Sequence, residues 1–269
     1  MSIREKLEEL KTRLRRIPRL AVSFSGGVDS ALLLKVAVDT LGSERVVAIT
    51  AKGANFPDRE FREAEELVRQ LGVRHVLLDF DVMAVTGFVE NSPERCYHCK
   101  KELFLAALDA AQREGADALA DGANTDDEGD YRPGMRATAE LGIVSPLREA
   151  GMGKADIRQL LKEFGMPDWN KPSLACLASR IPYGTAIAKE DMERVDRAEC
   201  FLLGAGLRNV RVRHHGDLAR IEVEAEDKRR FFEDAAFADG VVAALRDIGY
   251  KYVTLDLKGY RTGSMNEGL

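Results

Sequence analysis

One segment, Ser-Phe-Ser-Gly-Gly-Val-Asp-Ser at residues 23–30, constrains the fold of this chain more than any other. It follows the apolar residues 20–22 and precedes a run at 31–37 that is typical of a helix. A strand, a glycine turn and a helix in this order bring backbone N–H groups and the positive end of a helix dipole close to an anion. The segment therefore predicts a phosphate-binding loop. It has no G-x-x-x-x-G-K-[ST] pattern, so no loop lysine is placed to reach β- and γ-phosphates.

The composition is that of an ordinary acidic globular protein. The chain has 269 residues, of which 45% are hydrophobic and 32% charged, with a net charge of −5. This balance disfavours a nucleic-acid partner, because neutralising phosphates usually requires a basic surface. Residues 1–6 are charged and lack the apolar core of a signal peptide, and no stretch approaches the roughly 18 apolar residues of a membrane span. We expect a cytoplasmic protein whose four cysteines form no structural disulfides.

Strand and helix patterns alternate through the first part of the chain. Strands are predicted by apolar runs at 19–24, 45–50, 76–78, 118–120 and 143–144. Helices are predicted by amphipathic runs at 3–16, 31–42, 57–71, 100–113 and 136–141. This βαβα order indicates an α/β fold, with a Rossmann-like parallel sheet and helices on both of its faces.

The pattern changes after residue 184, and we place a domain boundary between residues 186 and 187. This gives a first domain at 1–186 and a smaller C-terminal α+β domain at 187–269. Two alternating runs joined at Gly216 predict a β-hairpin in the second domain. Its other elements are expected to be helices at 190–203 and 228–248 and a strand at 252–255. We expect mostly antiparallel pairing in this domain.

Residues that follow the predicted strands are candidates for a nucleotide site, because ligands of parallel sheets bind outside the carboxyl ends of the strands. The end of the first strand and the loop after it contribute Ser23, Ser25, Gly26, Gly27, Asp29 and Ser30. Thr50 lies at the end of the second strand, and an acidic run at 121–128 follows the fourth. In that run Gly122, Asn124 and Asp127 are candidate contacts, since carboxylates near a triphosphate usually hold Mg²⁺. By itself the run would also suit an exposed acidic loop.

The cysteines form a third candidate site. Cys96 and Cys99 are a C-x-x-C pair, and Cys176 stands alone. Zinc could take these three and His98 as four ligands, and a [4Fe–4S] cluster could take the three thiolates and keep one iron open. The pair could also be unligated thiols, whereas a redox couple is disfavoured because no thioredoxin-like context surrounds it. Arg180 would favour the thiolate of Cys176, and with it a nucleophilic or sulfur-carrying role.

Several segments together resemble the LarE family of ATP-dependent sulfurtransferases. They are residues 25–30, 95–101, 130–134, 145–148, 172–184 and 255–261. The likeness runs over essentially the whole chain, and its most specific part is 172–184. The loop at 25–30 is shared by the wider PP-loop superfamily of ATP pyrophosphatases, the adenine nucleotide α hydrolases. The resemblance implies a PP-loop fold for the first domain, with ATP and Mg²⁺ as cofactors.

The resemblance also implies a two-step reaction in the synthesis of the nickel-pincer nucleotide cofactor of lactate racemase. ATP adenylates a carboxylate of pyridinium-3,5-biscarboxylic acid mononucleotide and releases pyrophosphate, and sulfur then displaces AMP to leave a thiocarboxylate. In one kind of family member, a single cysteine matching Cys176 gives up its own sulfur. In the other kind, three cysteines hold a [4Fe–4S] cluster that carries a sulfide. Cys96, Cys99 and Cys176 resemble the second kind, with Cys200 a buried structural thiol outside the site, and sacrificial use of Cys176 is the alternative.

Substrate contacts are expected in the second domain. Arg211 and Arg213 lie two residues apart on a predicted strand, so they share a face, and paired guanidiniums suit the phosphate of a mononucleotide. By the resemblance, Glu199 and Glu222 match acidic positions that bind a divalent metal. The catalytic candidates are Asp29, Ser30, Cys176 and Arg180.

Two other functions fit the same patterns. A PP-loop tRNA-thiolating enzyme would also combine such a loop with three cysteines, but no RNA-binding module is recognisable here. A non-catalytic zinc- and nucleotide-binding protein would contain no iron. We expect a small-molecule mononucleotide as substrate, a homo-oligomer, and no membrane or nucleic-acid partner.

Overall fold

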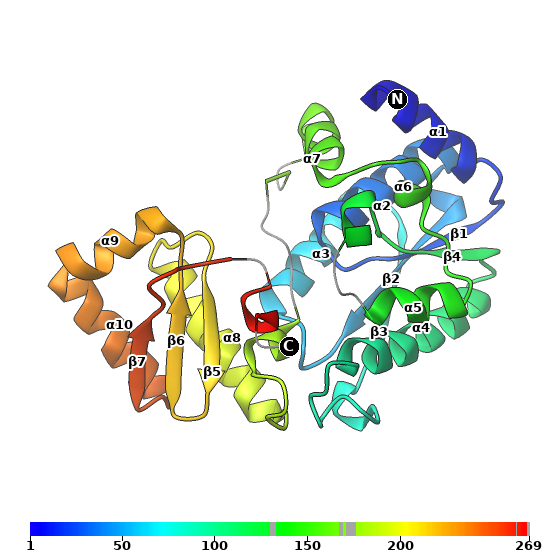
Figure 1. Cartoon of the computed structure of the whole chain (residues 1–269). Coiled ribbons are helices and arrows are strands. Elements are labelled where there is room, and N and C mark those ends of the chain that lie inside the picture. Colours follow the sequence, from blue (N-terminus) through cyan, green and yellow to red (C-terminus); the bar gives the residue numbers. More distant parts are fainter. Residues whose placement is uncertain (130–132, 167–168, 171–175, 262, 268–269) are drawn as a thin grey trace. The chain divides into compact units, whose positions relative to one another are not determined.

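The computed structural model describes residues 1–129, 133–166, 169–170, 176–261 and 263–267 (Figure 1). The chain forms two compact units, Met1–Val85 with Cys96–Leu174, and Thr86–Arg95 with Ala175–Leu269. A boundary between independently folding domains at 186/187 stays a prediction, because compactness does not show that a segment folds by itself. Among the described residues, no helix is long and apolar enough to cross a bilayer.

A four-stranded parallel sheet is the centre of the first unit (Figure 1). Its strands are β1 (Leu20–Ser23), β2 (Val46–Lys52), β3 (Arg74–Asp79) and β4 (Ala118–Ala120), in the order β3-β2-β1-β4. Every pairing between them is parallel. Val144, predicted to lie in a further strand, makes an isolated parallel bridge to Ala120. The predicted α/β fold with a parallel sheet is confirmed.

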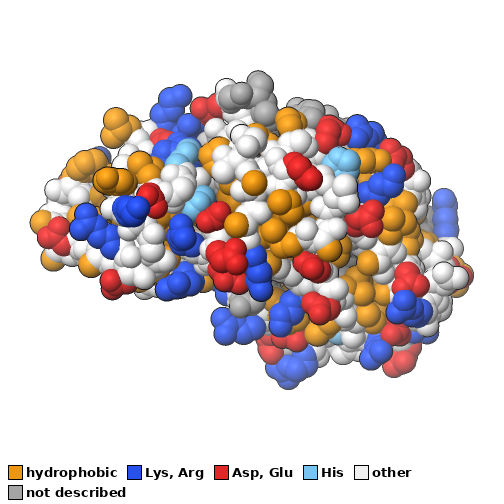
Figure 2. Space-filling model, turned by 90° about the horizontal axis from the view of Figure 1, so that it is seen from below, with side chains coloured by type: hydrophobic (Ala, Val, Ile, Leu, Met, Phe, Trp, Pro, Cys, Tyr) orange, Lys and Arg blue, Asp and Glu red, His pale blue; other side chains and the backbone are white. Residues whose placement is uncertain are grey.

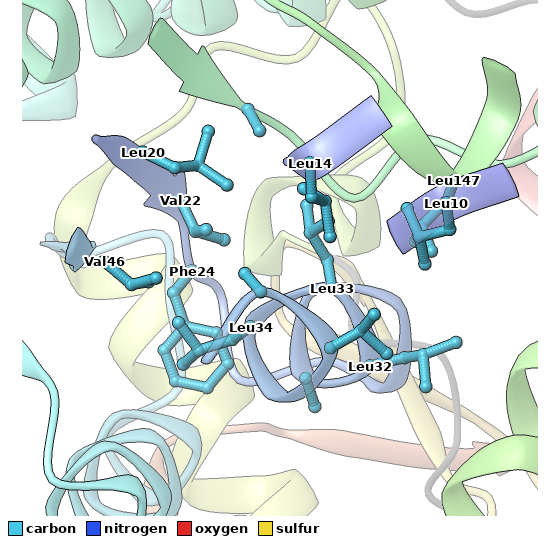
Figure 3. Close-up of a cluster of buried hydrophobic side chains, with 14 of the residues drawn as sticks. Leu10, Leu14, Leu20, Val22, Phe24, Leu32, Leu33, Leu34, Val46 and Leu147 are labelled. Atoms are coloured by element: carbon cyan, nitrogen blue, oxygen red, sulfur yellow. The ribbon is translucent and has the colours of Figure 1, made fainter. Parts of the chain in front are cut away.

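Helices cover both faces of this sheet. They are α1 (Ile3–Leu14), α2 (Val28–Leu41), α3 (Asp58–Leu71), α4 (Arg95–Arg113), α5 (Pro133–Glu140), α6 (Pro146–Glu149) and α7 (Lys154–Glu163). Successive residues of β1 enter opposite cores. Leu20 and Val22 belong to the cluster that includes Leu33 of α2 (Figure 3), whereas Ala21 packs with Phe104 of α4. This alternation follows from the two-residue period of a strand.

The order of the strands creates a switch point beside β1. From β1 the chain moves outward to β2 and β3, and it then returns to place β4 on the other side of β1. The loops after β1 and β4 therefore leave the sheet at neighbouring carboxyl ends. Open α/β sheets bind their ligands at such a point. The fold thus brings together the two loops in which the sequence analysis finds most of its nucleotide candidates.

The second unit is built on a three-stranded sheet in the order β5-β6-β7. Its elements are η4 (Leu177–Arg180), α8 (Lys189–Gly204), β5 (Arg211–His215), β6 (Leu218–Glu222), α9 (Ala225–Glu233), α10 (Ala235–Ile248), β7 (Tyr252–Leu255) and η5 (Ser264–Asn266). The hairpin predicted at Gly216 is confirmed, since β5 and β6 pair antiparallel on either side of it. Leu202 of α8 and Leu245 of α10 pack with Val212 of the sheet in one apolar core.

Some elements differ from the sequence-based expectation. α6 and α7 occupy residues where the sequence analysis places no helix, although Ile157, Leu160 and Leu161 of α7 follow a helical period and are buried. The single helix expected at 228–248 is two helices, because the Asp234 side chain accepts the Phe237 N–H and starts α10. β7 pairs parallel with β6 rather than antiparallel, because α9 and α10 form a crossover between the two strands.

Candidate functional site

The loop between β1 and α2 is closed by hydrogen bonds among its own residues. Ser30 Oγ lies 3.2 Å from Ser25 Oγ and donates to the Gly27 carbonyl at 3.1 Å. The Ser25 N–H donates to Ser30 Oγ at 3.3 Å. Gly26 has a φ of +77°, and a Cβ there would lie 3.0 Å from Ala64 Cβ on α3, so the turn requires glycine. The loop is therefore a compact turn that its own residues hold in place.

The N-terminus of α2 has no side-chain cap. Gly27 occupies the N-cap position of this 14-residue helix, so no N-cap side chain accepts from the first-turn N–H groups. Gly122, in the loop after β4, packs directly against this turn. A Cβ on Gly122 would lie 2.9 Å from the Ser30 nitrogen and 3.3 Å from the Asp29 carbonyl carbon. The two glycine-containing loops meet at a helix end that favours an anion.

A lysine that the sequence analysis does not identify holds Asp29. Lys154, the first residue of α7, donates from its ammonium group to Asp29 Oδ2. The other oxygen, Asp29 Oδ1, is buried and has no hydrogen-bond partner in the described part of the chain. Burial raises the pKa of Asp29, and the positive charges of Lys154 and Arg158 oppose this rise. A carboxylate with one open oxygen beside an ammonium group suits a site for Mg²⁺ and phosphate.

The loop after β4 contributes two more buried polar groups. Asp121 Oδ1 accepts from the Ser145 hydroxyl at 2.8 Å and from the Ala123 N–H at 3.2 Å. Asp121 Oδ2 has no hydrogen-bond partner among the described residues, and Lys100 Nζ lies 3.9 Å from it. Asn124 is 1% exposed, and its Nδ2 also lacks a partner there. Buried polar atoms are nearly always paired in folded proteins, so these atoms indicate a polar ligand.

Three further candidates for nucleotide binding, Thr50, Ser23 and Asp127, are described by the elements and contacts in which they lie. Thr50 lies inside β2 rather than at its end, because the strand continues to Lys52 in register with β3. Its buried hydroxyl lies 2.9 Å from His75 Nε2. Ser23 ends β1, and Asp127 Oδ2 accepts the Asn124 N–H at 3.0 Å. A role for these residues in nucleotide binding stays a prediction.

A pocket of about 290 Å³ borders the same loop on the side of α3. Gly26 contributes to its lining, together with apolar side chains that include Phe24, Leu67 and Leu161. The lining also includes Arg62, Gln70, Glu63 and Glu66, and the two carboxylates would repel a triphosphate. The pocket therefore suits the phosphates less well than the α2 N-terminus does, and a phosphate site at that N-terminus stays a prediction.

The cysteines lie in both units. Cys96 and Cys99 are three residues apart in the first turns of α4, on one face of the helix. Cys176 precedes η4 in the second unit, and Cys200 on α8 is exposed rather than buried. Among the described residues, no group of three or more His, Cys, Asp or Glu side chains is arranged to hold a metal ion. A cluster shared by Cys96, Cys99 and Cys176 stays a prediction.

Arg180 and Glu199 form a buried ion pair in the second unit. Arg180 Nε donates to Glu199 Oε1 at 2.9 Å, and Nη2 donates to Oε2 at 2.8 Å. Oε1 also accepts the Val212 N–H at 3.0 Å. Burial would raise the pKa of Glu199, but the charge and hydrogen bonds of Arg180 outweigh it and hold this pKa below its usual range. The third nitrogen of Arg180 donates to the Cys176 carbonyl at 3.1 Å, which ties the pair to the cysteine segment.

Arg211 and Arg213 both lie on β5, and both are buried. Arg213 Nη2 donates at 2.7 Å to Glu222 Oε2, on a residue with no exposed surface. The guanidinium carbon of Arg211 lies 5.3 Å from the centre of the Tyr260 ring. Burial and the nearby charge of Arg180 lower the pKa of Arg211. Positive groups are therefore close enough to repel one another in this cluster. Glu199 and Glu222 are each engaged by an arginine, and a metal-binding role for them stays a prediction.

Positive charge is in excess among the buried groups of the second unit. The buried residues with permanent charge described there are Arg95, Arg180, Arg211, Arg213, Glu199 and Glu222. Four buried guanidinium groups and two buried carboxylates are thus described in this unit, and buried charge is costly when it is not compensated. The cluster is suited to an anionic ligand such as a phosphate.

Several residues of these sites are missed by the sequence analysis: Lys100, Ser145, Lys154, Arg95, Tyr260 and Ser264. A helix start at Lys154 has a sequence signal, since this residue follows a glycine and begins an amphipathic run. Arg95 directly precedes the C-x-x-C pair. Ser264 had no local signal, because its partner Arg213 is 51 residues away in the sequence.

Comparisons with known proteins place this arrangement in a family. The family model for NAD synthase matches residues 3–114. An uncharacterised protein of Synechocystis sp. is 40% identical over 267 residues, which are 99% of this chain and 99% of that protein. The pyridinium-3,5-bisthiocarboxylic acid mononucleotide synthase of Lactiplantibacillus plantarum is 39% identical over 260 residues, 97% of this chain and 93% of that protein. The tRNA-specific 2-thiouridylase of Pelobacter propionicus is 30% identical, but over 55% of this chain and 50% of its own length.

The extent of these matches separates the two named relatives. The likeness to the thiouridylase covers about half of each protein, whereas the likeness to the mononucleotide synthase covers nearly all of both. The latter therefore includes the loops at the switch point, the cysteine segments and the buried arginine cluster. By this identity and coverage, the chain belongs to the LarE family, the family of pyridinium-3,5-bisthiocarboxylic acid mononucleotide synthase.

Proposed function

We propose that this protein is an ATP-dependent sulfurtransferase. It adenylates a carboxylate of pyridinium-3,5-biscarboxylic acid mononucleotide, releases pyrophosphate, and converts that carboxylate into a thiocarboxylate. The product agrees with the name of the Lactiplantibacillus plantarum relative. The observation that carries the proposal is the contact of Gly122 with the first turn of α2, which closes a phosphate-binding loop at the switch point.

ATP is assigned to the first unit, with its phosphates at the loop of residues 25–30. Mg²⁺ prefers oxygen ligands, and two buried carboxylate oxygens, Asp29 Oδ1 and Asp121 Oδ2, lack hydrogen-bond partners in the part of the chain that the structure describes. These residues therefore fit a bound Mg²⁺, and Asp127 is a further candidate ligand. The ion would neutralise the charge of the phosphates when bound. Lys154 supplies a second positive charge next to Asp29.

The first step is an attack of the acceptor carboxylate oxygen on the α-phosphorus of ATP. An O–P bond forms, the α–β bridging bond breaks, and pyrophosphate leaves with the electron pair. The loop N–H groups, the α2 N-terminus and Lys154 can stabilise the charge that develops on the leaving group. In the second step a sulfur nucleophile attacks the acyl carbon, and AMP leaves with the original carboxylate oxygen.

Two sources of sulfur fit the family. Cys96 and Cys99 lie on one helix face with suitable spacing for thiolate ligands, so they and Cys176 are the residues proposed to hold a [4Fe–4S] cluster. Such a cluster, with one iron not bound by the protein, would supply a renewable sulfide. The alternative is that Cys176 donates its own sulfur, which would limit the protein to one turnover.

The phosphate of the acceptor is assigned to Arg211 and Arg213 in the second unit. The excess of buried guanidinium groups supports this assignment, because an anionic ligand would offset their mutual repulsion. An assembly of identical chains stays a prediction.

The products of the nucleotide test this function. With ATP, the acceptor and Mg²⁺ present, phosphorus NMR should detect AMP and pyrophosphate, and Asp29→Ala should abolish both. Asp39→Ala is the matched control, since Asp39 lies on the same helix but is exposed and pairs with Lys35. ADP and orthophosphate as products would contradict the proposal. AMP formation that depends on tRNA rather than on the mononucleotide would favour the thiolation of RNA instead.

A further inference from the structure

We infer that Ser264 is a positioning residue for the phosphate of the acceptor. Its hydroxyl group fixes Arg213 so that the Nε of this arginine stays available to a ligand. The inference rests on the proposed function, because it deepens the assignment of Arg213 to the acceptor's phosphate. Ser264 begins η5 near the end of the chain and is 7% exposed.

Ser264 Oγ sits between Arg213 and Glu222. It accepts from Arg213 Nη2 at 2.8 Å, and its single proton is shared between Glu222 Oε1 at 2.9 Å and Oε2 at 3.1 Å. The same Arg213 Nη2 donates to Glu222 Oε2 at 2.7 Å. The hydroxyl thus completes a small closed network in which both carboxylate oxygens are engaged.

Three of the five N–H bonds of the Arg213 guanidinium group have acceptors among the described residues. The two on Nη2 go to Glu222 and Ser264, and Nη1 donates to the Ser179 carbonyl at 3.2 Å. Nε is buried and has no hydrogen-bond partner among the residues that the structure describes. A buried donor without an acceptor is costly, so this atom points to a ligand oxygen.

The pair of Arg180 with Glu199 has no hydroxyl group between the arginine and the carboxylate, so it can be compared with the pair of Arg213 and Glu222. Arg180 donates from Nε to one oxygen of Glu199 and from Nη2 to the other. This bidentate geometry is the one that arginine and carboxylate groups prefer. Arg213 bonds to one oxygen of Glu222. Ser264 competes for the second Nη2 proton, and it shares the other carboxylate oxygen with Arg220, whose Nη1 lies 3.4 Å from Glu222 Oε1. Removing the hydroxyl should let Arg213 adopt the geometry of Arg180 and withdraw Nε from the phosphate.

Calorimetric titrations with two ligands test this role. The ligands are the acceptor mononucleotide and the same nucleoside without its phosphate. Ser264→Ala should weaken binding of the mononucleotide by roughly 5- to 10-fold, which corresponds to the loss of about one hydrogen bond. Its affinity for the nucleoside should stay within about twofold of the wild-type value. Ser264→Thr, which keeps the hydroxyl group, should restore the affinity. Thr254→Ala is the matched control, since it removes a hydroxyl group of the same unit that, among the described residues, donates to the backbone carbonyl of Ala219.

A double-mutant cycle shows whether Ser264 acts through Arg213. In an Arg213→Ala background, Ser264→Ala should cause no further loss. A measurement on the unmutated protein does not depend on how the variants fold: the Nε–H resonance of Arg213 should shift with the mononucleotide but not with the nucleoside.

The outcomes separate this inference from the function on which it rests. The role proposed for Ser264 is wrong if Arg213→Ala weakens binding of the mononucleotide while Ser264→Ala does not. It is also wrong if Ser264→Ala weakens binding of both ligands equally. An additive loss in the double variant would also overturn it. If Arg213→Ala binds the mononucleotide as tightly as the wild type does, Arg213 does not bind the phosphate. That result would contradict the proposed acceptor site itself.

Discussion

Gly122 is the residue at which the two loops of the nucleotide site touch. A Cβ there would lie 2.9 Å from the Ser30 nitrogen and 3.2 Å from Ser30 Cα, and these backbone atoms cannot rotate away. Gly122→Ala should therefore displace the first turn of α2 and slow AMP formation by roughly tenfold or more, because small misplacements of reacting groups are costly. Steady-state release of AMP at saturating acceptor measures this effect.

Gly240→Ala is the control for that substitution. Gly240 lies exposed on α10, and a Cβ there would meet nothing within 4 Å. The variant should keep full activity and gain about 0.8–1 kcal/mol of stability, the difference between glycine and alanine inside a helix. Wild-type activity in Gly122→Ala would mean that the two loops do not act as one site.

Residues of the site differ in how far the sequence could identify them. The sequence predicts residues 25–30 and Gly122 as site residues, because glycine turns after strands have a local signature. It does not predict Lys154 and Ser264, because their partners are 125 and 51 residues away in the sequence, and only the fold brings them together. The sequence predicts Thr50 at the end of a strand, because the apolar run that predicts β2 stops two residues before the strand does.

At the scale of elements, α8 is fixed to β5 and η4 by the carboxylate of Glu199. Glu199→Gln leaves Arg180 buried without its counter-charge, which should cost about 3–5 kcal/mol of stability near pH 7. Urea denaturation monitored by circular dichroism measures this loss. Glu193→Gln on the same helix is the control. Its exposed pair with Lys189 should contribute less than about 1 kcal/mol.

The same pair makes stability depend on pH in a defined direction. The pKa of Glu199 is lower in the folded protein than in the unfolded chain, so its contribution is present above the unfolded pKa of about 4.3. It is lost as the pH falls through the folded pKa. The difference in stability between the wild type and Glu199→Gln should therefore shrink below about pH 4. A difference that stays constant from pH 7 to pH 3 would mean that the pKa of Glu199 is the same in the folded protein as in the unfolded chain.

Elements with strong periodicity could be predicted, and those set by longer-range effects could not. The strands of the first sheet follow from continuous apolar runs, which buried parallel strands require. The break between α9 and α10 depends on one capping side chain, Asp234, inside a continuous helical pattern. The parallel partner of β7 depends on the path of the crossover, which no local pattern encodes.

For the whole molecule, the source of sulfur decides whether the protein turns over more than once. Cys96 and Cys99 belong to the first unit and Cys176 to the second. On the proposal of a shared cluster, alanine at any of the three should lower the iron content to background after anaerobic purification, while adenylation survives. Cys200→Ala should keep the iron, because Cys200 lies elsewhere on α8. Iron and acid-labile sulfide assays measure both effects.

The mass of the protein after one turnover separates the two sources. An unchanged mass at Cys176 supports a renewable sulfide. A loss of about 34 Da, the mass of H₂S, would mean that Cys176 was consumed. Zinc in place of iron would contradict both sources and favour a structural metal site.

The fate of one oxygen atom tests the central claim, that the acceptor carboxylate is adenylated before sulfur enters. The acceptor is prepared with ¹⁸O in its carboxylates and incubated with ATP and the sulfur-loaded protein. The account predicts AMP that carries one ¹⁸O atom in its phosphate, detected by mass spectrometry, in equal amount to the thiocarboxylate. Unlabelled AMP would show that water and not the carboxylate attacked the α-phosphorus, and ADP in its place would show cleavage at another bond. Either result would contradict the account.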